Sequence, residues 1–185
     1  MVFLDRDGTI NIDTGYVSKP EDLHLIPGVA RAIGDLRRLG LAVFVVTNQS
    51  AIGRGKANVE DVERTNAEML KQLAAADPDA KIDRILYCPH RPSDGCSCRK
   101  PLIGMFTELP EQIRAKVDIQ SSFMVGDKWS DLDFGLNLGL SAERCFLVLT
   151  GHGAEEAESS RKDLPSPLPS LVEAVEKIRA LKCSS

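Results

Sequence analysis

The sequence predicts an α/β fold in which helices cover both faces of one doubly wound, mostly parallel sheet. Segments with strand-like and helix-like apolar patterns alternate along the chain, which is the order of βαβ units. The clearest strand, residues 41–46 (LAVFVV), is continuously apolar, as expected where both faces of a strand are buried. Several predicted strands end in polar residues, and ligands of open α/β sheets bind at the carboxyl ends of strands. We therefore expect a functional site along that edge.

The elements of the first half of the chain follow from apolar spacing and from helix-ending residues. Residues 2–5 form a short apolar strand that runs into carboxylates. Residues 28–39 carry apolar side chains at helical spacing, and Gly40 ends this helix. After the apolar strand already described, the pattern predicts a second helix over residues 58–76 and a third strand over residues 82–87.

The second half of the chain begins with a loop. Residues 88–101 are polar and rich in Cys, Pro and Gly, a composition typical of loops. Residues 105–115 have a helical pattern, which Pro110 should kink or split. The remaining predictions are strands over residues 123–125 and 145–150, helices over residues 131–138 and 171–181, and a charged surface connection over residues 154–169.

Size and charge limit the classes of protein that fit. At 185 residues, with no internal repeat and no long linker, we expect a single domain over residues 1–185. The net charge of −4 argues against nucleic acid or an anionic membrane as the main partner, because both need a basic surface. No run of about 18 apolar residues is present, and the N-terminal segment MVFLDRDG does not resemble a secretory signal. We expect a cytosolic protein.

The first chemical motif is FLDRDGTIN. Asp5 and Asp7 are two residues apart, so in an extended chain both point to the same side, and Gly8 lets the chain turn away. Two carboxylates this close repel each other unless a cation lies between them, which implies Mg²⁺. With the metal, Asp5 can attack phosphorus while Asp7 acts as general acid and base. For this motif alone, an acidic strand end before a turn, as in calcium loops, is the alternative.

Two further motifs supply groups suited to phosphate. VVTNQS follows the apolar strand and offers the Thr47 hydroxyl, while Asn48 can fix the attacking geometry; the alternative is a polar helix cap. In the loop, Lys100 can neutralise charge on phosphoryl oxygens and Arg99 can bind a second anionic group. Taken alone, this basic pair could equally be solvated.

The fourth motif, MVGDKWSDL, places acidic residues after another strand. Asp127 is well placed as a second acidic Mg²⁺ ligand, and Lys128 supplies a cation beside it. Asp131 can hold a metal-bound water or support the ligands. An acidic residue near a helix N-terminus also interacts favourably with the helix dipole, and for Asp131 the two interpretations are compatible.

A second metal site is predicted in the loop. Cys88, His90, Cys96 and Cys98 supply three thiolates and one imidazole, a complete tetrahedral set for Zn²⁺ with no open position, so this metal should be structural. The alternative, unrelated buried cysteines beside a surface histidine, fits poorly with a polar loop. Zinc here would fix the loop just before the basic pair.

The four motifs, in the order DxDGT…TNQ…K…GD, together resemble the haloacid dehalogenase (HAD) superfamily of phosphotransferases over almost the whole chain. The resemblance implies a Rossmann-like fold without a large cap domain. It also implies that Asp5 is the nucleophile, Asp7 the general acid and base, and Thr47 and Lys100 the groups that stabilise the phosphoryl group. Mg²⁺ would bind Asp5, the backbone carbonyl of Asp7, and Asp127.

The loop motif CPH…CxCRKP narrows the resemblance to two subgroups, the heptose bisphosphate phosphatases and the histidinol-phosphate phosphatases. DTGYV, VTNQSAIGRGK, GDKWSDL and LVLTGHG are similar to the heptose subgroup, although Ala51 stands where that subgroup usually has glycine. The resemblance implies hydrolysis of the C7 phosphate of a small sugar bisphosphate for nucleotide-activated heptose (lipopolysaccharide or S-layer) synthesis. It implies substrate contacts from Arg6, Asp13, Gly15, Tyr16, Asn48, Gln49, Ser50, Arg99 and Lys128. A small, open site favours a monomer that acts on a diffusible substrate.

Two other functions stay open at this point. Histidinol phosphate is the alternative substrate within the enzymes. Outside them, the chain could be a zinc-stapled binding module with an inactive HAD fold, although four intact charged motif residues argue against it. A nucleic-acid end-processing phosphatase fits less well with the acidic charge and only nine aromatic residues, six Phe, two Tyr and one Trp.

Overall fold

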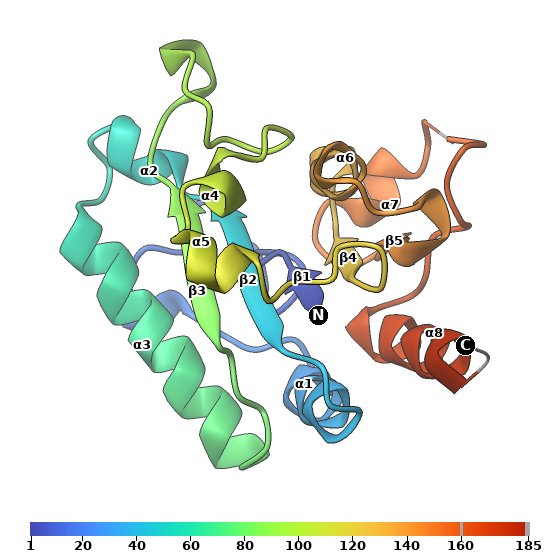
Figure 1. The fold of residues 1–185 in the computed structure, drawn as a ribbon. Coiled ribbons are helices and arrows are strands. Elements are labelled where there is room, and N and C mark those ends of the chain that lie inside the picture. Colours follow the sequence, from blue (N-terminus) through green and yellow to red (C-terminus); the bar gives the residue numbers. More distant parts are fainter. Residues whose placement is uncertain (160, 184–185) are drawn as a thin grey trace.

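A five-stranded parallel sheet forms the centre of the computed structural model (Figure 1), which describes residues 1–159 and 161–183. The strand order β3-β2-β1-β4-β5 confirms the predicted doubly wound fold. The single-domain prediction also covers residues 160, 184 and 185, which lie outside the described residues. The strands are β1 (Val2–Leu4), β2 (Val43–Asn48), β3 (Arg84–Cys88), β4 (Phe123–Gly126) and β5 (Cys145–Leu147).

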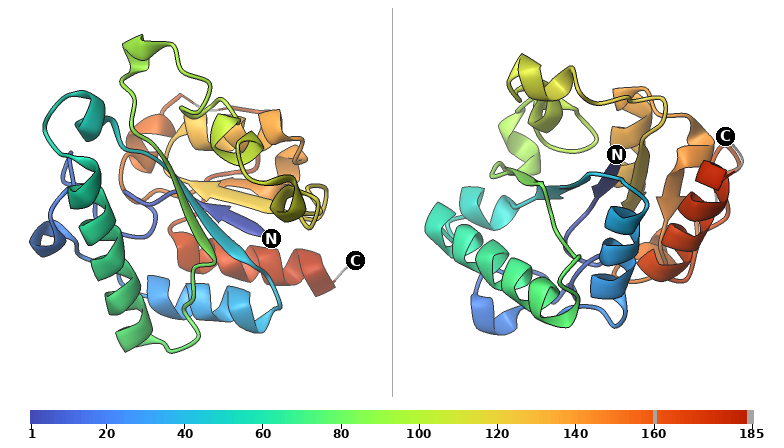
Figure 2. Two further views of the ribbon diagram at one scale, coloured as in Figure 1. Left: turned by 60° about the vertical axis from the view of Figure 1, so that its left-hand side comes forward. Right: turned by 60° about the horizontal axis from the view of Figure 1, so that its bottom comes forward.

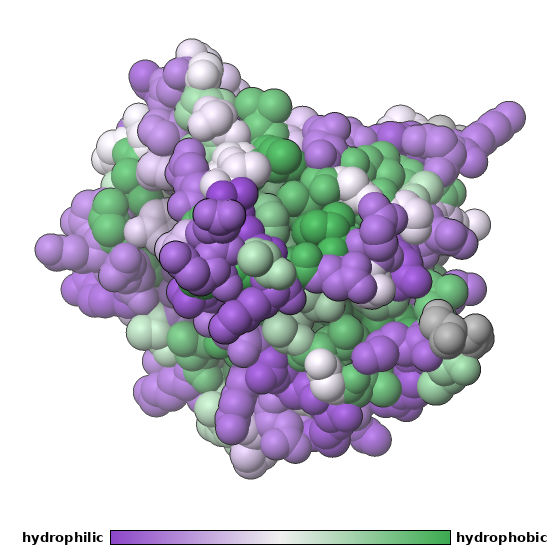
Figure 3. Space-filling model, in the orientation of Figure 1, coloured by the Kyte–Doolittle hydropathy of each residue, from purple (hydrophilic) through white to green (hydrophobic). Residues whose placement is uncertain are grey.

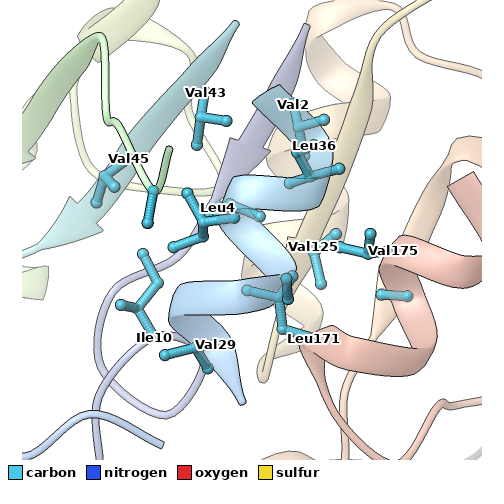
Figure 4. Packing of buried hydrophobic residues seen from close by; sticks show 14 of the residues in the cluster. Val2, Leu4, Ile10, Val29, Leu36, Val43, Val45, Val125, Leu171 and Val175 are labelled. Atoms are coloured by element: carbon cyan, nitrogen blue, oxygen red, sulfur yellow. The ribbon is translucent and has the colours of Figure 1, made fainter. Parts of the chain in front are cut away.

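One face of the sheet is covered by three helices, of which α1 and α8 lie side by side (Figure 2). Strand residues with alternate side chains, such as Val2 and Leu4, point into this layer and are fully buried. Figure 4 shows them packed against Leu36 and Leu171 from the helices. The helices are α1 (Val29–Arg38), α3 (Val59–Ala76) and α8 (Leu171–Cys183).

The other face carries further helices over an aromatic core. Phe3, which points opposite to Val2 and Leu4, makes edge contacts with Phe44, Phe106 and Phe134. On this side, apolar surface appears between α4 and α6 among charged side chains (Figure 3). These helices are α4 (Gly104–Thr107), α5 (Glu111–Arg114) and α6 (Trp129–Leu138).

Most predicted elements are confirmed, including the break at Pro110, with differences at the last strand and in two short helices. Pro110 splits its helical segment into α4 and α5, as its missing N–H predicts. The last strand is shorter than predicted, because Leu149 bonds to Leu168 outside the sheet. Two single-turn helices, α2 (Ser50–Gly53) and α7 (Gly153–Glu156), were not predicted, since four residues are too few to give an apolar period.

The connections at the carboxyl edge are short. Between β1 and α1 the chain forms only loops and a 3₁₀ turn, and β2 leads directly into α2. A large cap domain has no place in either connection, as predicted. In the described part of the chain, no helix is long and apolar enough to cross a membrane.

Candidate active site

A polar cavity of about 240 Å³ lies where the carboxyl ends of β1, β2 and β4 meet. The register pairs Leu4 with both Val45 and Val125, so the residues that follow these strands emerge together. Most of the predicted site residues line this cavity, and His152, Ser130 and Ala51 line it as well. The predicted residues at its wall are Asp5, Asp7, Asp13, Gly15, Tyr16, Thr47, Asn48, Gln49, Ser50, Arg99, Lys100, Lys128 and Asp131.

Asp5 and Lys100 form a buried ion pair at the cavity floor. Lys100 Nζ lies 2.5 Å from Asp5 Oδ1 and 2.8 Å from Asp131 Oδ1, and it donates to the Val46 carbonyl at 2.6 Å. Burial would lower the pKa of Lys100, but Asp131 and Asp5 outweigh it and raise that pKa. Lys100 is therefore a fixed positive charge beside the Asp5 carboxylate.

Lys100 is held in place by Asn48 at the end of β2. The Lys100 N–H donates to Asn48 Oδ1 at 3.0 Å, and Asn48 Nδ2 donates to the Lys100 carbonyl at 3.3 Å. This two-way bond joins the cysteine loop to the central sheet. Asn48 thus positions a charged group of the site.

Asp5, Asp127 and Asp131 bring three carboxylates within 4.8 Å of one another. Within the described residues, Asp127 Oδ1 is buried and has no hydrogen-bond partner. Burial raises the pKa of Asp127 to about 8, and repulsion from Asp5 and Asp131 adds to the effect. Buried carboxylates with a free oxygen and raised pKa values fit a hard divalent cation such as Mg²⁺.

Asp131 differs from the other two carboxylates because both of its oxygens have protein partners. Oδ1 pairs with Lys100, and Oδ2 accepts the Lys128 N–H at 3.0 Å, which caps α6. This arrangement fits the predicted supporting role for Asp131. Asp127 Oδ2 accepts the His152 N–H at 2.8 Å, its one partner among residues 1–159 and 161–183, which leaves Oδ1 for a metal.

The Asp7 carboxylate lies beside Asp5 in a network of side-chain donors. Gln49 Nε2 donates to Asp7 Oδ2 at 2.8 Å and to Thr47 Oγ1 at 3.0 Å. Asn11 Nδ2 donates to Asp7 Oδ1 at 2.9 Å. Asn11 was not predicted, although it ends the motif FLDRDGTIN.

Arg6 does not line the cavity, which corrects its predicted substrate contact. Its side chain is completely buried, and its guanidinium bonds to Asp7, Asn66 and the Val17 carbonyl. Because Asp5 and Asp7 alternate with Arg6 in an extended segment, the arginine points to the opposite side.

The rim of the cavity carries a second charged group. Asp13 Oδ2 lies 3.6 Å from Lys128 Nζ and 3.4 Å from His152 Nε2. Lys56 Nζ lies 4.2 Å from the centre of the Tyr16 ring, so the loops after β1 and α2 meet at the mouth. His152 was not predicted, although it lies in the quoted segment LVLTGHG.

The cysteine loop brings its four predicted ligands together. Cys98 Sγ lies 3.0 Å from Cys88 Sγ and 3.2 Å from His90 Nδ1, and Cys88 Sγ lies 3.6 Å from Cys96 Sγ. All four donor atoms lie within 4.8 Å of one another. Around a tetrahedral Zn²⁺ such ligands lie roughly 3.5–3.8 Å apart, so the two Cys98 contacts are shorter than in a metal-bound site, while the composition and grouping of the four donors fit Zn²⁺.

Comparison with known proteins places this fold and site in a family. Residues 1–141 match the family described as polynucleotide kinase 3 phosphatase. The D-glycero-beta-D-manno-heptose-1,7-bisphosphate 7-phosphatase of Escherichia coli K12 is 37% identical over 184 residues, covering 95% of this chain and 93% of that protein. The enzyme of that name from Photorhabdus laumondii is 37% identical over 186 residues and covers 96% of both chains.

Solved structures agree with these relatives. The crystal structure of a D,D-heptose 1,7-bisphosphate phosphatase from B. bronchiseptica, complexed with magnesium and phosphate, has a TM-score of 0.85 at 31% identity, and the match covers 97% of this chain and 98% of that one. A D,D-heptose 1,7-bisphosphate phosphatase from Burkholderia thailandensis has a TM-score of 0.65 at 30% identity and covers 100% of this chain and 97% of that one.

The parallel sheet, with Asp5, Lys100 and Asp127 at its carboxyl edge, defines a phosphatase of the HAD superfamily. Its relatives match over nearly their whole length, and their names agree. The chain belongs to the family described as polynucleotide kinase 3 phosphatase and, within the HAD superfamily, to the D-glycero-D-manno-heptose-1,7-bisphosphate 7-phosphatases.

Proposed function

We propose that this protein removes the C7 phosphate of D-glycero-D-manno-heptose 1,7-bisphosphate and releases heptose 1-phosphate. One observation carries the proposal: Asp5, Lys100 and Asp127 meet in one buried cluster in a chain whose near full-length relatives bear this enzyme's name. The product would serve nucleotide-activated heptose synthesis.

The reaction proceeds in two steps. In the first, an Asp5 oxygen attacks phosphorus, the bond between phosphorus and the sugar oxygen breaks, and Asp7 gives that oxygen its proton. In the second, water attacks phosphorus while Asp7 takes its proton, the bond between phosphorus and Asp5 breaks, and inorganic phosphate leaves, which regenerates the Asp5 carboxylate. Lys100 neutralises charge on the phosphoryl oxygens throughout, and Thr47 donates its hydroxyl to one of them.

Asp5, Asp127 and the backbone carbonyl of Asp7 would hold Mg²⁺. When bound, the ion supplies positive charge to the phosphoryl oxygens and separates the carboxylates. The free Oδ1 of Asp127 supports this assignment. Asp131 keeps the Lys100 ammonium in position beside the ion.

The rest of the substrate meets the rim of the cavity. Lys128 and Arg99 supply positive charge for the second phosphate. The loop of Asp13, Gly15 and Tyr16 and the polar residues Asn48, Gln49 and Ser50 provide hydrogen bonds for the sugar hydroxyls. All of them line one cavity, which supports a single binding site for the whole bisphosphate.

We further propose that Cys88, His90, Cys96 and Cys98 bind a structural Zn²⁺. Arg99 follows the last ligand directly and also donates to the His90 carbonyl at 3.3 Å. A metal that fixes this loop therefore fixes the direction in which the basic pair points.

A substrate panel tests the proposed reaction. Phosphate release is compared for both anomers of heptose 1,7-bisphosphate, histidinol phosphate, glucose 6-phosphate and an oligonucleotide with a 3′-phosphate, using wild-type protein and Asp5→Asn. We expect at least tenfold higher kcat/KM on a heptose bisphosphate, and loss of nearly all activity in the variant. A tenfold preference for histidinol phosphate or for the oligonucleotide would overturn the proposed substrate.

A monomeric state, a cytosolic location and the lack of a nucleic-acid partner stay predictions of the sequence. The oligonucleotide in the panel tests the last of these, because a family described as polynucleotide kinase 3 phosphatase matches residues 1–141. Sedimentation at several protein concentrations tests the first.

A further inference from the structure

The Asp7 carboxylate has a donor at each of its lone-pair positions. Oδ1 accepts from Arg6 Nε at 3.1 Å and from Asn11 Nδ2 at 2.9 Å. Oδ2 accepts from Arg6 Nη2 at 3.0 Å and from Gln49 Nε2 at 2.8 Å. Since a carboxylate offers about four acceptor positions, a proton on Asp7 has to replace one of these donors.

Arg6 binds Asp7 from the protein interior and is itself fixed on that side. Its Nη1 donates to Asn66 Oδ1 on α3 at 2.8 Å, and its Nη2 donates to the Val17 carbonyl at 2.9 Å. The Arg6 side chain is 0% exposed, whereas that of Asp7 is 17% exposed and faces the cavity. A planar guanidinium bound through two nitrogens fixes the plane of its carboxylate partner.

Gln49 is the donor that can give way. Of the four donors to Asp7 in the described structure, it is the one from a cavity-lining side chain. Its amide also donates to Thr47 Oγ1 at 3.0 Å, so it keeps a partner when it leaves Asp7. Asn11 has no exposed surface and is also tied to the Ile12 carbonyl at 3.0 Å.

We propose that Arg6 is the positioning residue of the general acid and base, holding Asp7 in one plane while Gln49 yields its place on Oδ2 to a proton. This inference rests on the role proposed above for Asp7. The proton passes from Asp7 Oδ2 to the ester oxygen as the bond between phosphorus and that oxygen breaks and the bond from Asp5 to phosphorus forms. Arg6 keeps both of its bonds to Asp7 throughout, because Asn66 and Val17 hold it from behind.

The dependence on the leaving group tests this role. The value of kcat/KM reports steps up to departure of the leaving group, so later activation of water does not enter. A sugar alcohol needs a proton to leave, whereas 2,4-dinitrophenolate does not. General acid catalysis contributes about 10²–10⁴-fold. For Arg6→Lys we expect a loss of about thirtyfold or more on heptose 1,7-bisphosphate and of less than about threefold on 2,4-dinitrophenyl phosphate.

A second variant removes the support of Arg6 without touching Asp7. Asn66→Leu should give a smaller loss with the same selectivity, about fivefold on the sugar ester and less than twofold on the aryl ester. Thr65→Val is the matched control, since Thr65 is the buried neighbour on α3 and its hydroxyl bonds only to the Asp61 carbonyl. If Arg6→Lys does not fold, as judged by its thermal melt, the comparison of Asn66→Leu with Thr65→Val tests the inference instead.

Two outcomes would overturn the inference: equal losses on both esters in a folded Arg6 or Asn66 variant, or no loss on either. Asp7→Asn separates this failure from failure of the proposed function. If Asp7→Asn shows the selective loss and the Arg6 and Asn66 variants do not, only the positioning role is wrong. If Asp7→Asn is itself unselective, the role of Asp7 is wrong, and the inference about Arg6 is overturned with it.

Discussion

Asp127 occupies a space that two glycines leave open. A side chain on Gly8 or on Gly151 would overlap with Asp127 Oδ2. Both glycines have positive φ angles, 88° and 58°, so an L-residue there would also be strained. At the residue scale, therefore, the loops after β1 and β5 are shaped to admit one carboxylate.

Gly151→Ala should weaken Mg²⁺ binding, because its Cβ would push Asp127 out of place. We expect the Mg²⁺ concentration for half-maximal activity to rise roughly tenfold or more, which corresponds to about 1.4 kcal/mol. Gly55→Ala is the matched control: Gly55 has a φ of 68°, and in the described residues no heavy atom beyond its chain neighbours lies within 4 Å of an added Cβ. Equal Mg²⁺ requirements in the two variants would contradict this account of Gly151.

Lys100→Met should lower kcat by about 10²–10³-fold, the usual cost of losing one preorganised charge at a reacting group. The variant keeps most of the side-chain volume but leaves Asp5 and Asp131 without their cation. Lys71→Met, an exposed lysine on α3 paired only with Glu68, controls for loss of charge. Initial rates at saturating substrate check the prediction, and a loss of less than tenfold would refute it.

Residue alternation explains what the sequence reveals about the first motif and what it hides. The period of two predicts that Asp5 and Asp7 share one side, and the same period implies that Arg6 points away from the site. The family resemblance implied a substrate contact for Arg6, and this prediction was wrong. The Asn66 partner of Arg6 lies 60 positions along the chain, and no local pattern reports such a contact.

At the scale of elements, the cysteine loop (residues 88–101) has no regular structure beyond one 3₁₀ turn, yet it carries Arg99 and Lys100. Its sulfur atoms lie close together, and its thiols differ in pKa. Burial would raise the pKa of Cys96. Hydrogen bonds from the Arg99 N–H and from the neighbouring thiols outweigh this effect and lower that pKa to about 7. Cys96 is thus readily available as a thiolate ligand.

Loss of zinc should lower activity without removing the nucleophile. For Cys96→Ser we expect loss of bound zinc by metal analysis and a fall in kcat/KM of roughly tenfold to a hundredfold, because the basic pair is displaced by an ångström or so. Cys183→Ser, at the exposed end of α8, is the control and should retain both. Zinc-free protein with unchanged kinetics would defeat the prediction.

Elements with a strong apolar pattern were predictable, and those defined by tertiary contacts were not. The predicted strand over residues 145–150 is apolar as far as Leu149, yet β5 ends at Leu147, because Val148 and Leu149 meet the segment around Leu168 instead of continuing the strand. The apolar pattern does not show where the chain leaves the sheet, since Val148 is buried beyond the end of β5 while Leu149 is 39% exposed. By contrast, Pro110 predicted a break in the helical segment over residues 105–115, and the structure has this break.

At the scale of the whole molecule, the buried carboxylates make stability depend on pH. Burial raises the pKa of Asp127 to about 8 and that of Asp5 to about 6, from a normal value of 3.8. At pH values between the normal pKa and the raised ones, the folded protein binds more protons than the unfolded chain. The free energy of unfolding therefore falls as pH rises through this range. For protein treated with a chelator of Mg²⁺, we expect the Tm to be roughly 5 °C or more lower at about pH 8.5 than at about pH 5.

Added Mg²⁺ and one substitution test whether the buried carboxylates cause this effect. Mg²⁺ should restore most of the lost Tm at the higher pH, because the cation balances the carboxylates. Asp127→Asn should have a flatter profile, since it removes the group with the larger shift. A Tm of chelator-treated wild-type protein that rises over the same interval would show that the sign is wrong.

The central position of β1 has a consequence for biosynthesis. Val2 pairs with Val43 on one side and with Phe123 on the other. While the ribosome is still making the stretch between those two partners, β1 has one edge that nothing closes. An open, apolar strand edge invites pairing with other chains. A nascent chain stalled before β4 therefore has its future nucleophile directly after an aggregation-prone strand, and we expect it to need protection from other chains most in this interval.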